Sequence, residues 1–206
     1  MLALIKKLLK RFPIIDLGQE NPNSASRRIS LNLILASNGA KALDAGCREG
    51  RQTKVLEAKG YVVTSVDIDK IYKKCQVIDL NSAIPFNDDH FDLIYCSEVL
   101  EHLCNPDFTV SEFIRTLTPG GTLILTTPNS YCVWFRLLYF FGLKKEKIQK
   151  EDHVQFFNIE DMHRLFPGAR VFGFWPFIIK FRVTYGISFL SPTFIIQMTK
   201  DNLSGK

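Results

Sequence analysis

Two glycines and two acids, placed where apolar segments end, carry the first chemical signal in this 206-residue chain. Residues 43–50 read LDAGCREG, and Gly46 and Gly50 permit a tight turn that brings backbone against a ligand. Asp67 and Asp79 end the next two apolar segments. A carboxylate at the first position can accept hydrogen bonds from both hydroxyls of a ribose, and one at the second can accept from an adenine amino group. The ordered set predicts a site for an adenine nucleoside.

A second group joins two acids to a histidine: Glu98, Glu101 and His102. On a helical turn, residues three and four apart share a face. His102 is the first candidate for a base toward an oxygen or nitrogen nucleophile, and the alternative is a structural histidine bonded to the backbone. We predict no metal here. If a divalent metal were bound, its ligands would be Glu98, Glu101 and His102, with His153 as a distant further ligand.

The elements that must position these residues alternate along the chain. Short, apolar, partly β-branched segments predict strands buried on both faces, and helical stretches lie between them. Alternation of this kind predicts crossover connections, a parallel α/β sheet and a ligand site at the carboxyl ends of its strands. The predicted strands span residues 41–44, 61–66, 76–78, 91–96 and 122–127, and the predicted helices between them span residues 51–59 and 107–117.

Capping residues mark the ends of two helices. Ser24 or Ser26 can cap a helix that Gly39 would end. Asn105 is placed to cap the helix at 107–117, and Pro106 fits its first turn. The last third of the chain predicts an aromatic helix at 131–141, a basic loop, a helix at 159–166 and strands at 170–175 and 193–199.

The length and composition favour one globular domain. With 46% hydrophobic and 23% charged residues, the chain can bury a substantial core. We predict a single domain of four parts: N-terminal helices or cap at 1–39, a cofactor-binding half at 40–130, a substrate-side insertion at 131–158, and a C-terminal helix with strands at 159–206.

Charge and cysteine usage limit the surroundings of the protein. The net charge is +5, and its basic clusters are either solvated faces or contacts for phosphate or anionic lipid. Five cysteines without metal-ligand spacing predict a reducing, cytoplasmic setting. The first twelve residues mix leucines with lysines and predict an amphipathic helix, which either packs on the domain or lies on a membrane surface. No segment has the apolar length of a membrane span.

The residues above resemble the class I S-adenosylmethionine-dependent methyltransferases of the small single-domain type. The resemblance covers about residues 40–130, with a weaker match at 153–166. Its motifs are specific to the family and not to any substrate. The matching segments are residues 42–47 (ALDAGC), 66–68 (VDI), Asp79, 84–86 (IPF) before 91–94 (FDLI), 97–103 (SEVLEHL), and 117–122 (LTPGGT) leading to 127–129 (TPN).

This resemblance implies a Rossmann-like three-layer sandwich with a mostly parallel seven-stranded sheet whose last strand is antiparallel. Arg48 departs from the family, which usually has glycine there; its side chain could point to solvent, brace the loop against an acid, or block the pocket. The resemblance implies S-adenosyl-L-methionine as cofactor, held by Asp44, Ala45, Gly46, Cys47, Gly50, Asp67, Ile68, Asp79, Leu80 and Ser97.

The predicted function is therefore methyl transfer, by O- or N-methylation, to a small or amphipathic acceptor. The aromatic insertion with its basic rim suits a lipid-like acceptor, and nucleic acid is not expected as a partner. A catalytically inactive scaffold, or a metal-dependent methyltransferase acting on RNA or quinone precursors, is the alternative. A nicotinamide oxidoreductase is disfavoured because Arg48 and Arg51 stand where glycines are needed. The N-terminal helix leaves a peripheral membrane contact open.

Overall fold

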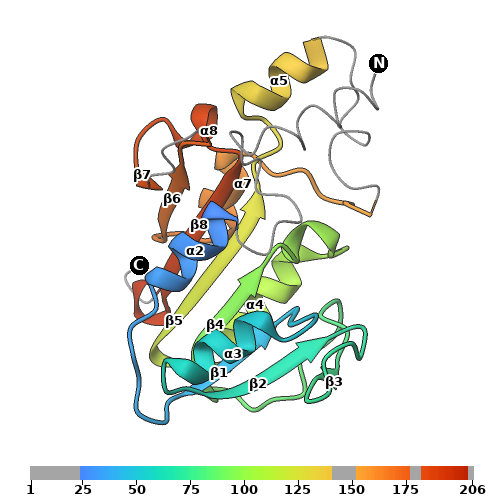
Figure 1. Cartoon of the computed structure of the whole chain (residues 1–206), viewed down its shortest axis with the longest axis vertical. Helices are drawn as coiled ribbons and strands as arrows, with labels where there is room; N and C mark the ends of the chain where they lie inside the picture. Colours follow the sequence, from blue (N-terminus) through green and yellow to red (C-terminus); the bar gives the residue numbers. More distant parts are fainter. Residues whose placement is uncertain (1–23, 141–151, 177–181, 204–206) are drawn as a thin grey trace.

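One mixed sheet forms the centre of the computed structural model, which describes residues 24–140, 152–176 and 182–203 (Figure 1). The strand order is β3-β2-β1-β4-β5-β8-β6-β7. Neighbours from β3 to β5 pair in parallel, whereas β8 is antiparallel to both β5 and β6. The strands are β1 Lys41–Ala45, β2 Val62–Asp67, β3 Gln76–Val77, β4 Phe91–Ser97, β5 Leu117–Pro128, β6 Arg170–Phe174, β7 Arg182–Val183 and β8 Thr193–Thr199.

This topology confirms the predicted α/β fold and its antiparallel last strand. The predicted count of seven strands is wrong, because β7 adds an eighth by pairing with β6. A strand of two residues has no alternation for a sequence pattern to reveal. The helices are α2 Ala25–Asn32, α3 Arg51–Ala58, α4 Pro106–Thr116, α5 Val133–Phe140, α7 Ile159–Leu165 and α8 Ile187–Leu190, with 3-10 turns η1 Leu100–His102 and η2 Lys200–Leu203.

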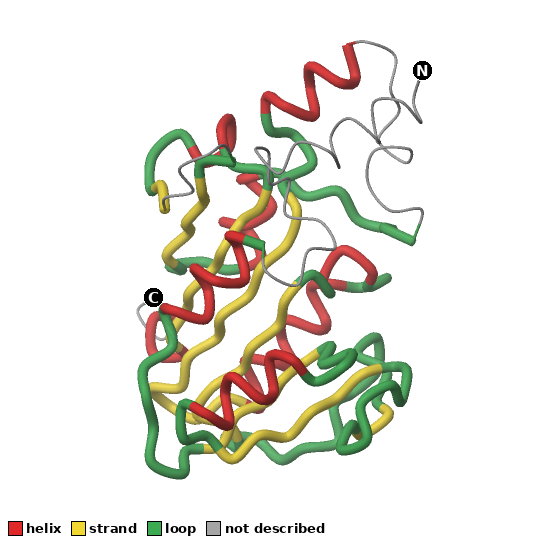
Figure 2. Tube along the Cα trace, viewed as in Figure 1, coloured by secondary structure: helices red, strands yellow, loops and turns green. Residues whose placement is uncertain are grey.

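Helices cover both faces of the sheet and make three layers. Adjacent strand residues point to opposite faces, so Leu43 joins a cluster with Phe113 of α4 and Met162 of α7. Its neighbour Ala42 joins a second cluster with Leu56 of α3. Figure 2 shows the strands as one twisted sheet with α2 and α3 crossing in front of it. Burial on both faces explains why the central strands are almost continuously apolar.

The caps decide where α2 and α4 begin. Ser24, and not Ser26, is the N-cap of α2 and accepts the Arg27 N–H at 3.4 Å. Asn105 caps α4 by accepting the Phe108 N–H at 3.2 Å, as predicted.

One predicted helix end and one predicted strand start are wrong. The first helix stops at Asn32, well before Gly39, because the chain then turns to bury Ile34 on the sheet and Ser37 donates its N–H to Lys59. The helix α4 stops at Thr116 because Leu117 already pairs with Phe91, so β5 begins earlier than residue 122.

The other predicted elements agree with the structure to within about two residues at each end. The five cysteines are free thiols. Within the described part of the chain, no helix is long and apolar enough to cross a membrane. The predicted helix at residues 1–12 and the basic loop at 144–150 lie outside the described residues.

Candidate functional site

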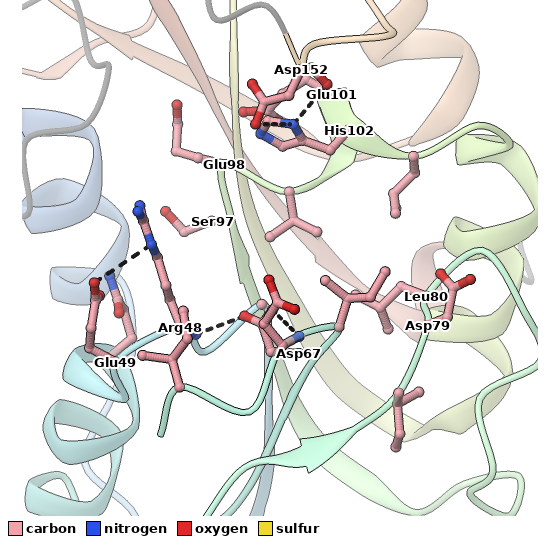
Figure 3. Close-up of a pocket in the computed structure, with 18 of the residues that line it drawn as sticks. Arg48, Glu49, Asp67, Asp79, Leu80, Ser97, Glu98, Glu101, His102 and Asp152 are labelled. Carbon is pink, nitrogen blue, oxygen red and sulfur yellow. Dashed lines mark hydrogen bonds and ion pairs between the residues drawn. The ribbon is translucent and has the colours of Figure 1, made fainter. Parts of the chain in front are cut away.

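A cavity of about 790 Å³ opens where β1, β2 and β4 end (Figure 3). Its size falls within the range of small-molecule sites, about 300–1,000 Å³. Open parallel sheets bind ligands at this edge. The lining residues are Arg27, Gly46, Arg48, Glu49, Arg51, Gln52, Asp67, Ile68, Asp69, Ile71, Ile78, Asp79, Leu80, Asn81, Ser97, Glu98, Val99, Glu101, His102, Leu103, Asp152 and His153.

The glycine turn between β1 and α3 shapes one wall. Gly46 has φ +81° and a Cβ there would overlap the Val99 side chain, so this position requires glycine on two grounds. Gly50 is the N-cap of α3 with φ +72°, and its missing Cβ leaves room for the Tyr72 ring. The turn therefore brings backbone and the start of α3 to the cavity, where helix amides can face an anionic group.

Asp67 stands at the end of β2, facing the cavity. One carboxylate oxygen accepts the Arg48 N–H at 2.8 Å and the other accepts the Asp69 N–H at 3.2 Å. A carboxylate has about four acceptor positions, so both oxygens keep capacity for a ligand. The two backbone bonds fix the side chain between Arg48 on one side and Asp79 on the other (Figure 3).

Asp79 lies two residues beyond β3, at the far end of the cavity from Arg48 (Figure 3). Its carboxylate accepts both the backbone and side-chain N–H groups of Asn81, at 2.9 and 3.0 Å. Apolar side chains beside an acid suit a flat base with one polar edge. Leu80 lies beside Asp79 (Figure 3), and the cavity lining also includes the apolar residues Ile68, Ile71 and Ile78.

Arg48 braces the turn. Its backbone adopts φ +46°, which positions the N–H toward Asp67. Its guanidinium lies 3.6 Å from the Glu49 carboxylate, and 62% of the side chain is exposed. The side chain thus combines two of the three sequence alternatives, since it is largely exposed to solvent and also lies beside an acid, and the cavity is open beside it.

Four of the ten residues predicted for cofactor binding do not line the cavity: Asp44, Ala45, Cys47 and Gly50. Asp44 is buried behind the turn, where the Thr53 hydroxyl donates to it at 2.5 Å. Burial raises the pKa of Asp44 to about 6, and the Thr53 hydrogen bond offsets part of this rise. Contact between these four residues and a ligand stays a prediction.

A hydrogen-bonded chain links α2 to β4 and β5 at the cavity wall. Arg27 Nε donates to Ser97 Oγ at 3.3 Å, and Ser97 Oγ lies 2.9 Å from Thr126 Oγ1. Thr126 Oγ1 in turn donates to Glu98 Oε1 at 3.0 Å. Sequence reasoning placed Ser97 here but missed Arg27, which it treated only as part of a basic cluster. The cap at Ser24 was the available signal, because it fixes where α2 begins.

The acids and histidines after β4 gather at the other side of the cavity. Glu98 has φ +57°, an unusual backbone conformation of the kind that gathers at functional sites. Buried Glu101 accepts the Thr127 hydroxyl at 3.0 Å. Ligand atoms of Glu101, His102 and His153 lie within 4.8 Å of one another, and the two imidazole rings meet edge to face at 4.7 Å. His153 therefore joins Glu101 and His102 in space, whereas Glu98, the fourth predicted ligand, is not in this group and accepts from Thr126 instead.

Asp152 orients His102. The Nδ1 atom of His102 lies 3.1 Å from the Asp152 carbonyl oxygen and 3.5 Å from its carboxylate. Because a carbonyl only accepts, Nδ1 must carry the hydrogen in this contact. In the neutral imidazole, Nε2 is then the acceptor. This arrangement can take a proton from a hydroxyl in the cavity.

Residues 17–170 match a family described as "Methyltransferase domain". The chain is 30% identical over 137 residues to a ubiquinone biosynthesis O-methyltransferase of Xylella fastidiosa, covering 58% of this chain and 56% of that protein. It is 29% identical over 146 residues to the protein of that name from Aromatoleum aromaticum, covering 61% of each. The chain thus spans somewhat more than half the length of these curated relatives.

Solved structures share the fold. The YcgJ protein of Bacillus subtilis has a TM-score of 0.65 at 17% identity, covering 84% of this chain and 97% of that chain. A SAM-dependent methyltransferase of Archaeoglobus fulgidus has a TM-score of 0.64 at 15% identity, covering 84% of this chain and 92% of that chain. At these identities the likeness is one of fold.

Proposed function

Because this chain belongs to the methyltransferase-domain family, we propose that it transfers the methyl group of S-adenosylmethionine to a hydroxyl oxygen of a small or amphipathic acceptor. One observation carries the proposal. A single cavity is lined by Gly46 of the glycine turn, by Asp67, the candidate acceptor for the ribose hydroxyls, and by His102, the candidate base.

The residues of the cavity fit the proposed methyl donor, whose sulfonium supplies an electrophilic methyl group. Asp67 would accept hydrogen bonds from the ribose hydroxyls, and Asp79 would accept from the adenine amino group. Arg27, held against Ser97, and the amides at the start of α3 offer positive charge for a carboxylate. The order of these groups along the wall supports a donor that extends from Asp79 toward Glu98.

Proton removal and positioning are the chemistry left to the protein. Methyl transfer from a sulfonium is an in-line displacement, so holding the nucleophile at attack distance in a water-poor site supplies most of the catalysis. His102 Nε2 would accept the proton of the hydroxyl nucleophile, and Asp152 would keep the ring in that tautomer. The relatives named ubiquinone biosynthesis O-methyltransferase support an oxygen nucleophile, and the name fits an amphipathic acceptor.

Binding and turnover of matched variants test the proposal. Asp67→Asn removes the charge with little change in shape, and we expect calorimetry to find S-adenosylmethionine bound at least about tenfold more weakly. Glu160→Gln, an exposed acid on α7, is the control and should bind as the wild type does. His102→Ala should keep binding yet lose about 10²–10⁴-fold in transfer rate to a hydroxyl acceptor. Failure of the wild-type chain to bind the donor would refute the proposal.

Metal-dependent O-methylation is a second candidate, favoured by the cluster of Glu101, His102 and His153. Imidazole nitrogen and carboxylate oxygen together suit a divalent transition metal. These three residues would hold the ion, which would polarise the acceptor oxygen. Calorimetry with Mn²⁺ alone distinguishes the candidates: His153→Ala should abolish uptake, while His163→Ala on the exposed side of α7 should not. If the wild type binds no Mn²⁺, the metal-dependent candidate is ruled out.

A further inference from the structure

Large apolar side chains are exposed on two neighbouring elements. Leu137 and Phe140 of α5 are 49% and 84% exposed, and Tyr185 and Phe189, before and within α8, are 89% and 53% exposed. Monomeric proteins leave such groups scattered, whereas several together mark a contact surface. We call these four side chains the aromatic end. Figure 1 shows α5 and α8 at the same end of the molecule.

The aromatic end is held in place by packing beneath it. Trp134 Nε1 donates to the Leu190 carbonyl at 2.8 Å, which ties α5 to α8, and its ring meets that of Trp175 edge to face. Phe135 is fully buried. Since residues three apart share a helix face, Leu137 and Phe140 project together from the side that the core does not use. The exposed side chains therefore stand on helices that are packed firmly against each other and against the core.

Positive charge borders these side chains. Arg136 is exposed next to Leu137 on α5. Arg182 is also exposed and shortly precedes Tyr185 in the sequence, but its guanidinium lies over the Phe172 ring, 4.9 Å from the ring centroid. In the sequence, Phe140 is followed by FGLKKEKIQKE, which has four lysines and two glutamates and lies outside the described residues. Apolar and aromatic groups flanked by basic residues complement the interface of an anionic bilayer, to which each nearby Lys or Arg adds attraction.

We propose that the aromatic end docks this protein on the surface of an anionic lipid bilayer. The aromatic side chains enter the headgroup region, and Arg136 faces lipid phosphates. Basic residues beside the aromatic end would attract anionic headgroups and would repel the same residues of a second copy. The proposal is independent of the proposed methyl transfer.

Docking at this end would bring the cavity close to molecules held in the bilayer. The strand β5 ends at Pro128 and α5 begins at Val133, so the aromatic end follows directly from the carboxyl edge of the sheet. The cavity opens at that same edge. An amphipathic acceptor could then reach the site without crossing water.

Co-sedimentation of the full chain with vesicles tests this proposal. Vesicles of phosphatidylcholine with phosphatidylglycerol should bind the protein, vesicles of phosphatidylcholine alone should bind it weakly, and added salt should reduce the binding. The double variant Phe140→Ser, Phe189→Ser should bind at least about tenfold more weakly, because its interface burial is lost. Leu35→Ser is the matched control, since Leu35 is 80% exposed in the connection between α2 and β1.

The outcomes separate the alternatives. Circular dichroism and donor binding should be unchanged in the double variant, so that lost sedimentation reports the surface and not unfolding. Equal binding by the double variant and wild type would overturn the proposal, as would wild-type protein left in solution with anionic vesicles. A dimer in light scattering that the double variant abolishes would assign the aromatic end to a second copy instead.

Discussion

Replacing Asp44 by asparagine should change how the stability of this protein depends on pH. Asp44 lies at the end of the buried strand β1, and desolvation raises its pKa from 3.8 to about 6 despite the Thr53 hydrogen bond. The folded state therefore holds this proton more tightly than the unfolded state does. As pH rises from about 4 to about 7, the wild type must ionise a buried acid, and its free energy of unfolding falls.

The size of the effect follows from the pKa shift. A difference of about two units corresponds to about 3 kcal/mol when the whole titration is crossed, of which about 2 kcal/mol lies between about pH 4.5 and 7.5. Urea unfolding of both proteins across that range measures it. The amide of the Asp44→Asn variant cannot titrate, so the difference in unfolding free energy between variant and wild type should shift by about 2 kcal/mol in favour of the variant as pH rises. Parallel stability curves would refute the reasoning, whatever their constant offset.

Four substitutions, one of them a control, test the local arguments by urea unfolding. Gly46→Ala should lower the free energy of unfolding by about 1–3 kcal/mol, because Gly46 has a positive φ and a Cβ there would overlap Val99. Gly39→Ala is the control and should cost less, because Gly39 also has a positive φ but open space around it. Equal losses in the two variants would count against the Val99 contact. Asn158→Ala removes the capping box of α7 and should cost about 1 kcal/mol, and no loss would mean that the cap is dispensable. Phe113→Ala should cost about 3–5 kcal/mol because the ring is fully buried, and a cost below about 1 kcal/mol would contradict its packing.

The elements of the fold were predictable where their signals are local. The caps at Ser24 and Asn105 and the apolar central strands act within a few residues, so the pattern predicts them well. The end of α2 was not predictable from Gly39, because burial of Ile34 and the bond from Ser37 to a distant turn end that helix. The short β7 depends entirely on its partner β6.

Sequence alone determined the order of the parts: a glycine turn, then Asp67, then Asp79, each following an apolar strand whose carboxyl end must lie at one edge. That order follows from the geometry of parallel strands, which the alternation of elements already implies. Only the tertiary structure decided that Arg27 bonds to Ser97 and that Asp152 holds His102, because these pairs are 70 and 50 residues apart and meet only when the layers pack. It also decided that Asp44 faces Thr53, behind the cavity, since the depth of a side chain depends on what covers the strand end.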